Sequence, residues 1–117
     1  MRRLILLVFL LLLPSSSFAA TATLTWDPNS ESDLAGYKVY RATKGCAVTV
    51  ASDFAAILTT GKVTTATDTL TVDGVYCYQL TAFDTSNNES GRSNKAEASL
   101  NVNPPQTPTN LRVIVTP

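Results

Sequence analysis

The stretch that decides the fold class of this chain is Tyr76-Cys-Tyr-Gln-Leu-Thr-Ala-Phe-Asp84. Its residues alternate one by one, which is the period of a β-strand whose two faces meet different surroundings. The alternation predicts an inner row of Tyr76, Tyr78, Leu80 and Ala82, and an outer row of Cys77, Gln79, Thr81 and Phe83. One face of this strand can therefore be buried while the other meets water or a partner.

Other stretches repeat the two-residue period on both sides of this strand. Leu24-Thr-Trp26 and Gly36-Tyr-Lys-Val-Tyr-Arg41 precede it, and residues 95–102 follow it. The inward rows predicted for them are Ala22, Leu24 and Trp26, then Tyr37 and Val39, and finally Ala96, Ala98, Leu100 and Val102. Residues 63–69 are interpreted as a further strand. Several short strands between turn formers, with no long helical period, indicate an all-β sandwich.

The region between residues 46 and 67 is harder to interpret. Ser52-Asp-Phe-Ala-Ala-Ile-Leu58 is compatible with a capped helical turn before Gly61 and also with an irregular edge strand rich in alanine and threonine. The two-residue period of the surrounding sequence favours the edge strand.

The N-terminus has the three parts of a secretory signal: Arg2-Arg3, the apolar run 4–13, and the small residues before and at Ala19. A membrane helix is the alternative, but this apolar run is far shorter than the ~20 residues that a bilayer requires. We therefore expect residues 1–19 to be a cleaved signal peptide. The mature protein is expected to be secreted, or to reside in the periplasm or at the cell surface.

Cleavage after residue 19 would leave 98 of the 117 residues, which is enough for one domain. Seven of the nine Lys and Arg residues would remain against nine Asp and Glu, so the mature net charge is near −2. Because no basic run is present, we expect no nucleic-acid partner. We also expect no membrane insertion after signal cleavage.

The residue types that support catalysis are sparse. The chain has no histidine, so a serine or cysteine nucleophile would depend on a lysine or a carboxylate as its base. No nucleophile motif, phosphate-binding glycine loop or metal-ligand spacing is present. We therefore expect no enzyme activity, no catalytic residue, no metal and no cofactor.

Several of these motifs together resemble a fibronectin type III domain of the bacterial secreted kind. They are Leu24-Thr-Trp26-Asp-Pro28, Asp33-Leu-Ala-Gly-Tyr-Lys-Val-Tyr-Arg41, Leu70 six residues before Tyr76, the strand 76–84, Asn88-Glu-Ser90 and Ser93-Asn94. The resemblance covers about residues 23–102 and implies an immunoglobulin-like β-sandwich over residues 20–103, with strands B, C, C′, E, F and G. It implies a structural core that includes Trp26, Tyr37, Leu70, Tyr76 and Leu80. Tyr76 would be the corner tyrosine, whose hydroxyl ties its strand to the preceding turn.

The sequence departs from this family in having almost nothing before the strand at Trp26, so strand A is missing at the N-terminus. Residues 104–117 resemble a Pro-rich linker followed by the opening strand of a next domain. Leu111, Val113 and Val115 alternate with Arg112, Ile114 and Thr116, which suits a strand that pairs with an open sheet edge. Head-to-tail self-association through residues 109–116 and a frayed tail are the two expectations for this segment.

The resemblance also implies a pairing for the only two cysteines. Strand C of the family ends at the pole where strand F begins, which places Cys46 near Cys77, and an exported chain enters an oxidising compartment. We therefore expect a disulfide between Cys46 and Cys77. A reactive thiol pair is the alternative, but nothing nearby in the sequence would lower a thiol pKa.

Two surfaces of the implied sandwich are candidate sites. One is a polar pole where two loops meet, at Asp27, Glu31, Asp33, Asp84, Asn87, Asn88 and Glu89. These oxygens either gather around Ca²⁺ or are solvated turn residues, and the absence of Ca²⁺-loop spacing favours the second interpretation. The other is the outer sheet face, as a possible binding face or as ordinary cross-strand pairs, at Tyr40, Gln79, Thr81 and Phe83.

Three functional hypotheses follow from the sequence. The first is a secreted, non-catalytic fibronectin type III module that contacts an extracellular protein or polysaccharide. The second is a structural spacer, or an assembly subunit that donates its C-terminal strand to a neighbour. The third is a fragment of a longer extracellular enzyme or adhesin.

Overall fold

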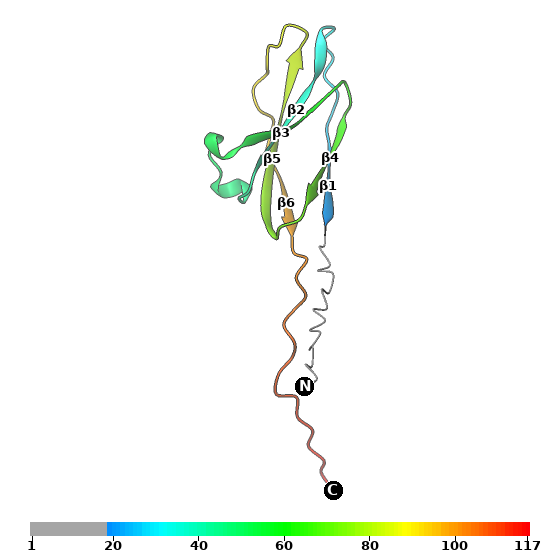
Figure 1. Ribbon diagram of the computed structural model, residues 1–117, viewed down its shortest axis with the longest axis vertical. Coiled ribbons are helices and arrows are strands. Elements are labelled where there is room, and N and C mark those ends of the chain that lie inside the picture. Colours follow the sequence, from blue (N-terminus) through cyan, green and yellow to red (C-terminus); the bar gives the residue numbers. More distant parts are fainter. Residues whose placement is uncertain (1–18) are drawn as a thin grey trace, which may run out of the picture.

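A computed structural model describes residues 19–117 of the chain, which form an all-β domain followed by an extended C-terminal tail (Figure 1). The strands are β1 (Ala20–Thr25), β2 (Leu34–Ala42), β3 (Ala55–Thr60), β4 (Thr65–Leu70), β5 (Gly74–Asp84) and β6 (Ala96–Leu100). Two 3₁₀ turns, η1 (Cys46–Val48) and η2 (Ala51–Asp53), supply the helical residues of the described part. The predicted signal peptide lies outside the described residues, apart from Ala19.

The strands form two antiparallel sheets. β1 pairs with β4, from Ala20 opposite Leu70 to Thr25 opposite Thr65. The other sheet has the order β3-β2-β5-β6, and its longest ladder joins β2 to β5. The all-β prediction is confirmed, because the regular structure of the described residues consists of these two antiparallel sheets and two short 3₁₀ turns.

A hydrophobic core lies between the two sheets. It contains Val39, Tyr76, Tyr78 and Leu100 from the four-stranded sheet, and Ala66 and Leu70 from β4. The inner row of β1, with Ala22, Leu24 and Trp26, packs on this core and remains half-buried. Leu80 is also half-buried, whereas Tyr37, Leu70 and Tyr76 are buried.

Aromatic side chains fix the two ends of the sandwich. Trp26 and Tyr37 pack edge to face with ring centroids 5.2 Å apart, and the Tyr37 hydroxyl accepts a hydrogen bond from the Asn29 backbone N–H. At the other end the Tyr76 hydroxyl donates to the carbonyl oxygen of Val72, in the turn between β4 and β5. Each tyrosine therefore ties a strand to a loop.

The region that was ambiguous in the sequence contains both predicted elements in succession. Residues 51–53 form a 3₁₀ turn, and β3 then begins at Ala55 as the edge strand of its sheet. The preferred prediction of an edge strand is confirmed for residues 55–60. The turn places Phe54 so that its ring is buried against the outer sheet face.

The C-terminal tail leaves the end of β6 and runs away from both sheets (Figure 1). Asp73 holds its first residues, because its carboxylate accepts hydrogen bonds from the Val102 backbone N–H and from the Asn103 side-chain amide. Residues 109–116 pair with no strand of the described chain, and Leu111, Val113, Ile114 and Val115 are 84–93% exposed. No helix in the described part of the chain is long and apolar enough to cross a membrane.

Candidate functional site

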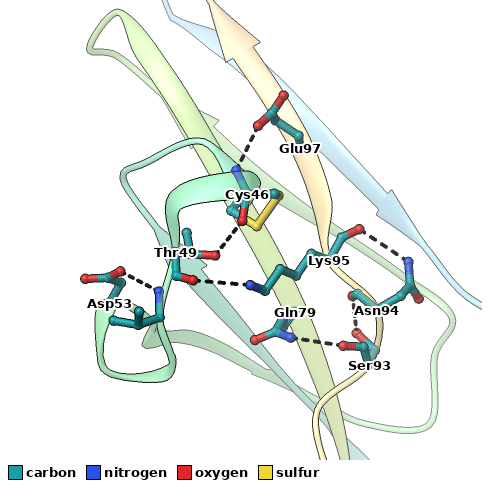
Figure 2. Close-up of a disulfide and its surroundings, with 10 residues drawn as sticks. Cys46, Thr49, Asp53, Gln79, Ser93, Asn94, Lys95 and Glu97 are labelled. Atoms are coloured by element: carbon teal, nitrogen blue, oxygen red, sulfur yellow. Dashed lines mark hydrogen bonds between the residues drawn. A yellow bond between two sulfur atoms is a disulfide. The ribbon is translucent and has the colours of Figure 1, made fainter.

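The disulfide joins the loop after β2 to the outer row of β5 (Figure 2). Cys46 and Cys77 have Cα atoms 5.0 Å apart, within the usual range for a disulfide, so the predicted pairing is present. The backbone N–H of Cys46 donates to Glu97 of β6, and its carbonyl oxygen accepts from the Thr49 hydroxyl. This bond anchors the segment 43–54, the disulfide loop, on the sheet.

The disulfide loop covers part of the outer face of the four-stranded sheet. Phe54 packs there with Ala42 and Cys77, and half-buried Tyr40 and Cys46 border this small second core. Cys77 is 0% exposed although it belongs to the outer row of β5. The outer face is therefore a packed surface around the disulfide.

Two cations from the β5–β6 connection (residues 85–95) lie on the aromatic rings of this second core. The Arg92 guanidinium lies 4.6 Å from the Tyr40 ring centroid and 5.4 Å from that of Phe54, and it donates to the carbonyl oxygen of Ala51. Lys95 lies 5.9 Å from the Phe54 centroid and donates to the carbonyl oxygen of Thr49. These contacts attach the disulfide loop to the β5–β6 connection.

Glu89 closes the same face at its other end. Its Oε1 atom accepts hydrogen bonds from the hydroxyls of Tyr40 and Thr81. The Tyr40 hydrogen bond, followed by that from Thr81, lowers the pKa of Glu89, and the same Glu89 contact raises the pKa of Tyr40. The carboxylate therefore acts as a polar lock between β2, β5 and the connection.

The predicted binding face at Tyr40, Gln79, Thr81 and Phe83 is consequently not an open surface. Thr81 is only 4% exposed, the other three are half-buried, and a Lys38 amine lies 5.6 Å from the Phe83 centroid. Residues 89–93 run beside β5 and bond to the backbone at Leu80 and Ala82. Sequence reasoning missed this cover because residues 85–95 have no strand period.

The polar pole predicted as a possible Ca²⁺ site is used to build a turn. The Asp84 carboxylate accepts hydrogen bonds from the backbone N–H groups of Ser86 and Asn88 and from the Asn88 side chain, and the side-chain bond contributes most to its lowered pKa. Among residues 19–117, no group of three or more His, Cys, Asp or Glu side chains is placed to hold a metal ion. Asp84 and Asn88 are therefore turn residues.

A polar tie crosses the core between the two sheets. Asp68 of β4 accepts hydrogen bonds from the Arg41 guanidinium of β2, at 2.8 Å, and from the Tyr78 hydroxyl of β5, at 2.7 Å. Arg41 also lies 5.5 Å from the Tyr76 ring centroid. The sequence analysis did not identify this tie, although the alternation of Ala66, Asp68 and Leu70 places the aspartate on the inner row.

A groove of about 320 Å³ opens between β1 of one sheet and β6 of the other. Residues 22–25 of β1 and the adjoining Trp26 form one wall, and Tyr78, Gln79 and Leu80 form the floor. Residues 93–94 and 96–98 form the other wall. Within residues 19–117, β1 has only β4 as a ladder partner and β6 has only β5. Within the described residues, β1 and β6 therefore each present an unpaired sheet edge to this β1–β6 groove.

Comparison of the chain with protein-family models and with curated proteins found no match.

Proposed function

We propose that the chain is an exported fibronectin type III module that makes protein contacts outside the cytoplasm and performs no reaction. The observation that carries the proposal is the hydrogen bond from Tyr76 to Val72, because a tyrosine at the start of strand F bonded back to the preceding turn is a hallmark of immunoglobulin-like sandwiches. The pairing of β1 with β4 and the order β3-β2-β5-β6 match strands B, E and C′-C-F-G of that topology.

The use made of the ionisable side chains supports a scaffold role. Asp68 and Arg41 tie the sheets, Glu89 locks the outer face, and Asp84 builds a turn. Asp73 holds the start of the tail. These groups have their hydrogen-bond partners within the fold, and such networks make the structure more rigid.

A protein partner is favoured over a polysaccharide because cations already lie on the aromatic rings of the outer sheet face. Flat sugar faces bind to free aromatic faces, but Arg92 occupies the Tyr40 ring and Lys38 lies over the Phe83 ring. In the part of the chain that the structure describes, unpaired strand edges are instead present at the β1–β6 groove, and sheet edges bind extended peptides through main-chain hydrogen bonds.

Binding of the labelled, exported protein to the envelope fraction of the cells that produce it tests the proposal. We expect saturable binding that is lost when the envelope is treated with protease and kept when its sugars are oxidised with periodate. Loss after periodate alone would assign the contact to polysaccharide instead. If the folded protein, with its disulfide shown by mass, does not bind to the untreated envelope fraction, the contact role is contradicted.

The second candidate function, a strand-donating assembly subunit, is favoured by a specific pair of features. They are the open β1–β6 groove and the exposed apolar tail.

A further inference from the structure

We infer that the β1–β6 groove is a docking site for residues 109–116 of a second copy of this chain, so that the protein assembles head to tail. The inference rests on the groove and the tail, and it holds whether or not the module also binds another partner.

The groove has the shape and the chemistry that an incoming strand requires. It follows β1 from Ala22 to Trp26, a length of about 13 Å at ~3.3 Å per residue. Small side chains, Ala22, Ala96 and Ala98, line its walls and leave room for larger ones. An apolar trough along an unpaired strand accepts both a new ladder and one row of side chains.

The backbone of β1 supports the ladder. The Trp26 N–H donates to the Thr64 carbonyl oxygen, and the Leu24 carbonyl oxygen accepts from the Thr65 side-chain hydroxyl. The even-numbered residues therefore direct their backbone groups toward β4. Because neighbouring residues of a strand direct these groups to opposite sides, Thr23 and Thr25 present theirs at the free edge. Those are the groups that an incoming strand would pair.

The tail carries a matching pattern. Leu111, Val113 and Val115 form one apolar row, and each is more than 80% exposed in the single chain. Burying one such side chain removes enough apolar surface from water to strengthen binding by about tenfold or more. Burial of this row in an apolar groove is therefore strongly favourable.

The tail is poorly placed to fill the groove of its own molecule. β6 ends beside the start of β1, since Leu100 pairs with Gly74 while Ala20 pairs with Leu70 at the other side of the same turn. A strand that pairs antiparallel with β1 begins beside the C-terminal end of β1. To begin there, the tail would have to run back about 20 Å along β1 and also cross the ~10 Å between the sheets. Asp73 fixes the tail at Asn103, and the linker from there to residue 109 reaches only about 20 Å.

The composition of the linker also directs the tail outward. Pro104, Pro105 and Pro108 favour an extended, semi-rigid conformation and disfavour a reversal of direction. The length of the linker does not prevent the tail from reaching the groove of a neighbouring molecule. A contact between one molecule's tail and the next molecule's groove is heterologous, and it generates open chains if its rotation does not close a ring.

Two matched variants of the full, exported chain test the inference by light scattering over a concentration series. Val113→Lys places a charge in the inward row, and we expect it to weaken self-association by about tenfold or more. Ile114→Lys places the same charge one residue along, in the outward row, and we expect it to change self-association by less than about twofold. Both positions are exposed in the single chain, so neither change disturbs the fold.

Trp26, the only tryptophan, lines the groove and reports its occupation by fluorescence. A peptide of residues 103–117 added to the Val113→Lys protein should change the Trp26 emission saturably. The same peptide carrying Val113→Lys should not change it.

Three outcomes would overturn the inference. The first is a wild-type protein that stays monomeric at high concentration with a protease-sensitive tail. The second is a monomer whose tail is protected, which would mean that the tail fills its own groove. The third is equal weakening by both lysine variants, which would indicate non-specific association of apolar surface.

Discussion

The Tyr78 hydroxyl of β5 donates a hydrogen bond of 2.7 Å to the Asp68 carboxylate of β4, and this bond connects the two sheets through the core. Burial, followed by the Asp68 hydrogen bond, raises the pKa of Tyr78 well above its usual range. The phenol therefore stays protonated and keeps donating at physiological pH. Arg41 completes the tie by donating to the same Asp68 oxygen.

Removing Asp68 should destabilise the fold substantially. Asp68→Ala leaves Arg41 without its partner, and we expect a loss of about 2 to 3 kcal/mol in the free energy of unfolding. That is less than the ~3–5 kcal/mol for a broken buried pair, because the Arg41 side chain keeps 28% of its exposure. Asp68→Asn, which retains an acceptor for Tyr78, should lose less. Urea titrations measure both, and equal stability of Asp68→Ala and the wild type would refute the tie.

The alternation of residues in the sequence predicts the two sheets and most of the core, because a period of two assigns each strand residue to a face. It predicts Val39 and Tyr37 as inward, and both are buried. The covering of the outer sheet face by the disulfide loop and the β5–β6 connection is not predicted by this period. It depends on long-range contacts such as that of Arg92 with the Tyr40 ring, and Arg92 lies in a segment without any strand period. Such contacts become visible only when the chain is folded.

The groove illustrates the same limit. Within residues 19–117 β1 pairs with β4 alone, so its other edge is open. The strand pattern of the sequence does not show that β6 lies across from that edge, or that alanines line both walls. That juxtaposition depends on how the two sheets pack, which the strand pattern alone does not specify.

The disulfide should contribute strongly to stability. Cys46 and Cys77 are 31 residues apart, and closing a loop of that length lowers the entropy of the unfolded chain by the equivalent of about 3 to 4 kcal/mol. The double variant Cys46→Ala, Cys77→Ala should therefore unfold at a clearly lower urea concentration than the oxidised wild type. Reduced wild type is the matched control and should resemble the double variant. Coincident urea midpoints of oxidised and reduced wild type would contradict the prediction.

The Glu89 lock should make stability depend on pH in the acid range. The folded-state pKa of Glu89 is lower than its unfolded value of about 4.3, so the lock contributes fully above that pH. Its contribution is lost as the pH falls through the folded pKa. The stability difference between wild type and Glu89→Gln should thus be constant near neutrality and shrink below about pH 4.

A second variant separates this lock from general acid effects. Tyr40→Phe removes the hydrogen bond that lowers the Glu89 pKa most. The stability of this variant should therefore also depend less on pH below about pH 4. The raised pKa of Tyr40 adds a contribution that is present below about pH 10 and lost as the pH rises through the folded value. As the pH rises through this range, the stability of Tyr40→Phe should fall less than that of the wild type. An unchanged pH profile of stability in both Glu89→Gln and Tyr40→Phe would refute the lock.

The close approach of two strands at Gly36 gives the sharpest steric prediction. A Cβ atom at this position would lie 2.0 Å from the backbone carbonyl oxygen of Thr60 in β3, and 3.1 Å from the tip of the Phe83 ring. Because the first obstacle is backbone, Gly36→Ala must push β3 away from β2, and overpacking of this kind costs about 1 to 3 kcal/mol. Gly61→Ala is the matched control, since nothing lies within 4 Å of its added carbon. Thermal unfolding should show a clear loss for Gly36→Ala and no loss, or a gain of about 0.4 to 1 kcal/mol, for Gly61→Ala. Faster amide exchange along β3 in the Gly36 variant would locate the damage, and a Gly36→Ala protein as stable as the wild type would show that β2 and β3 are not packed this closely.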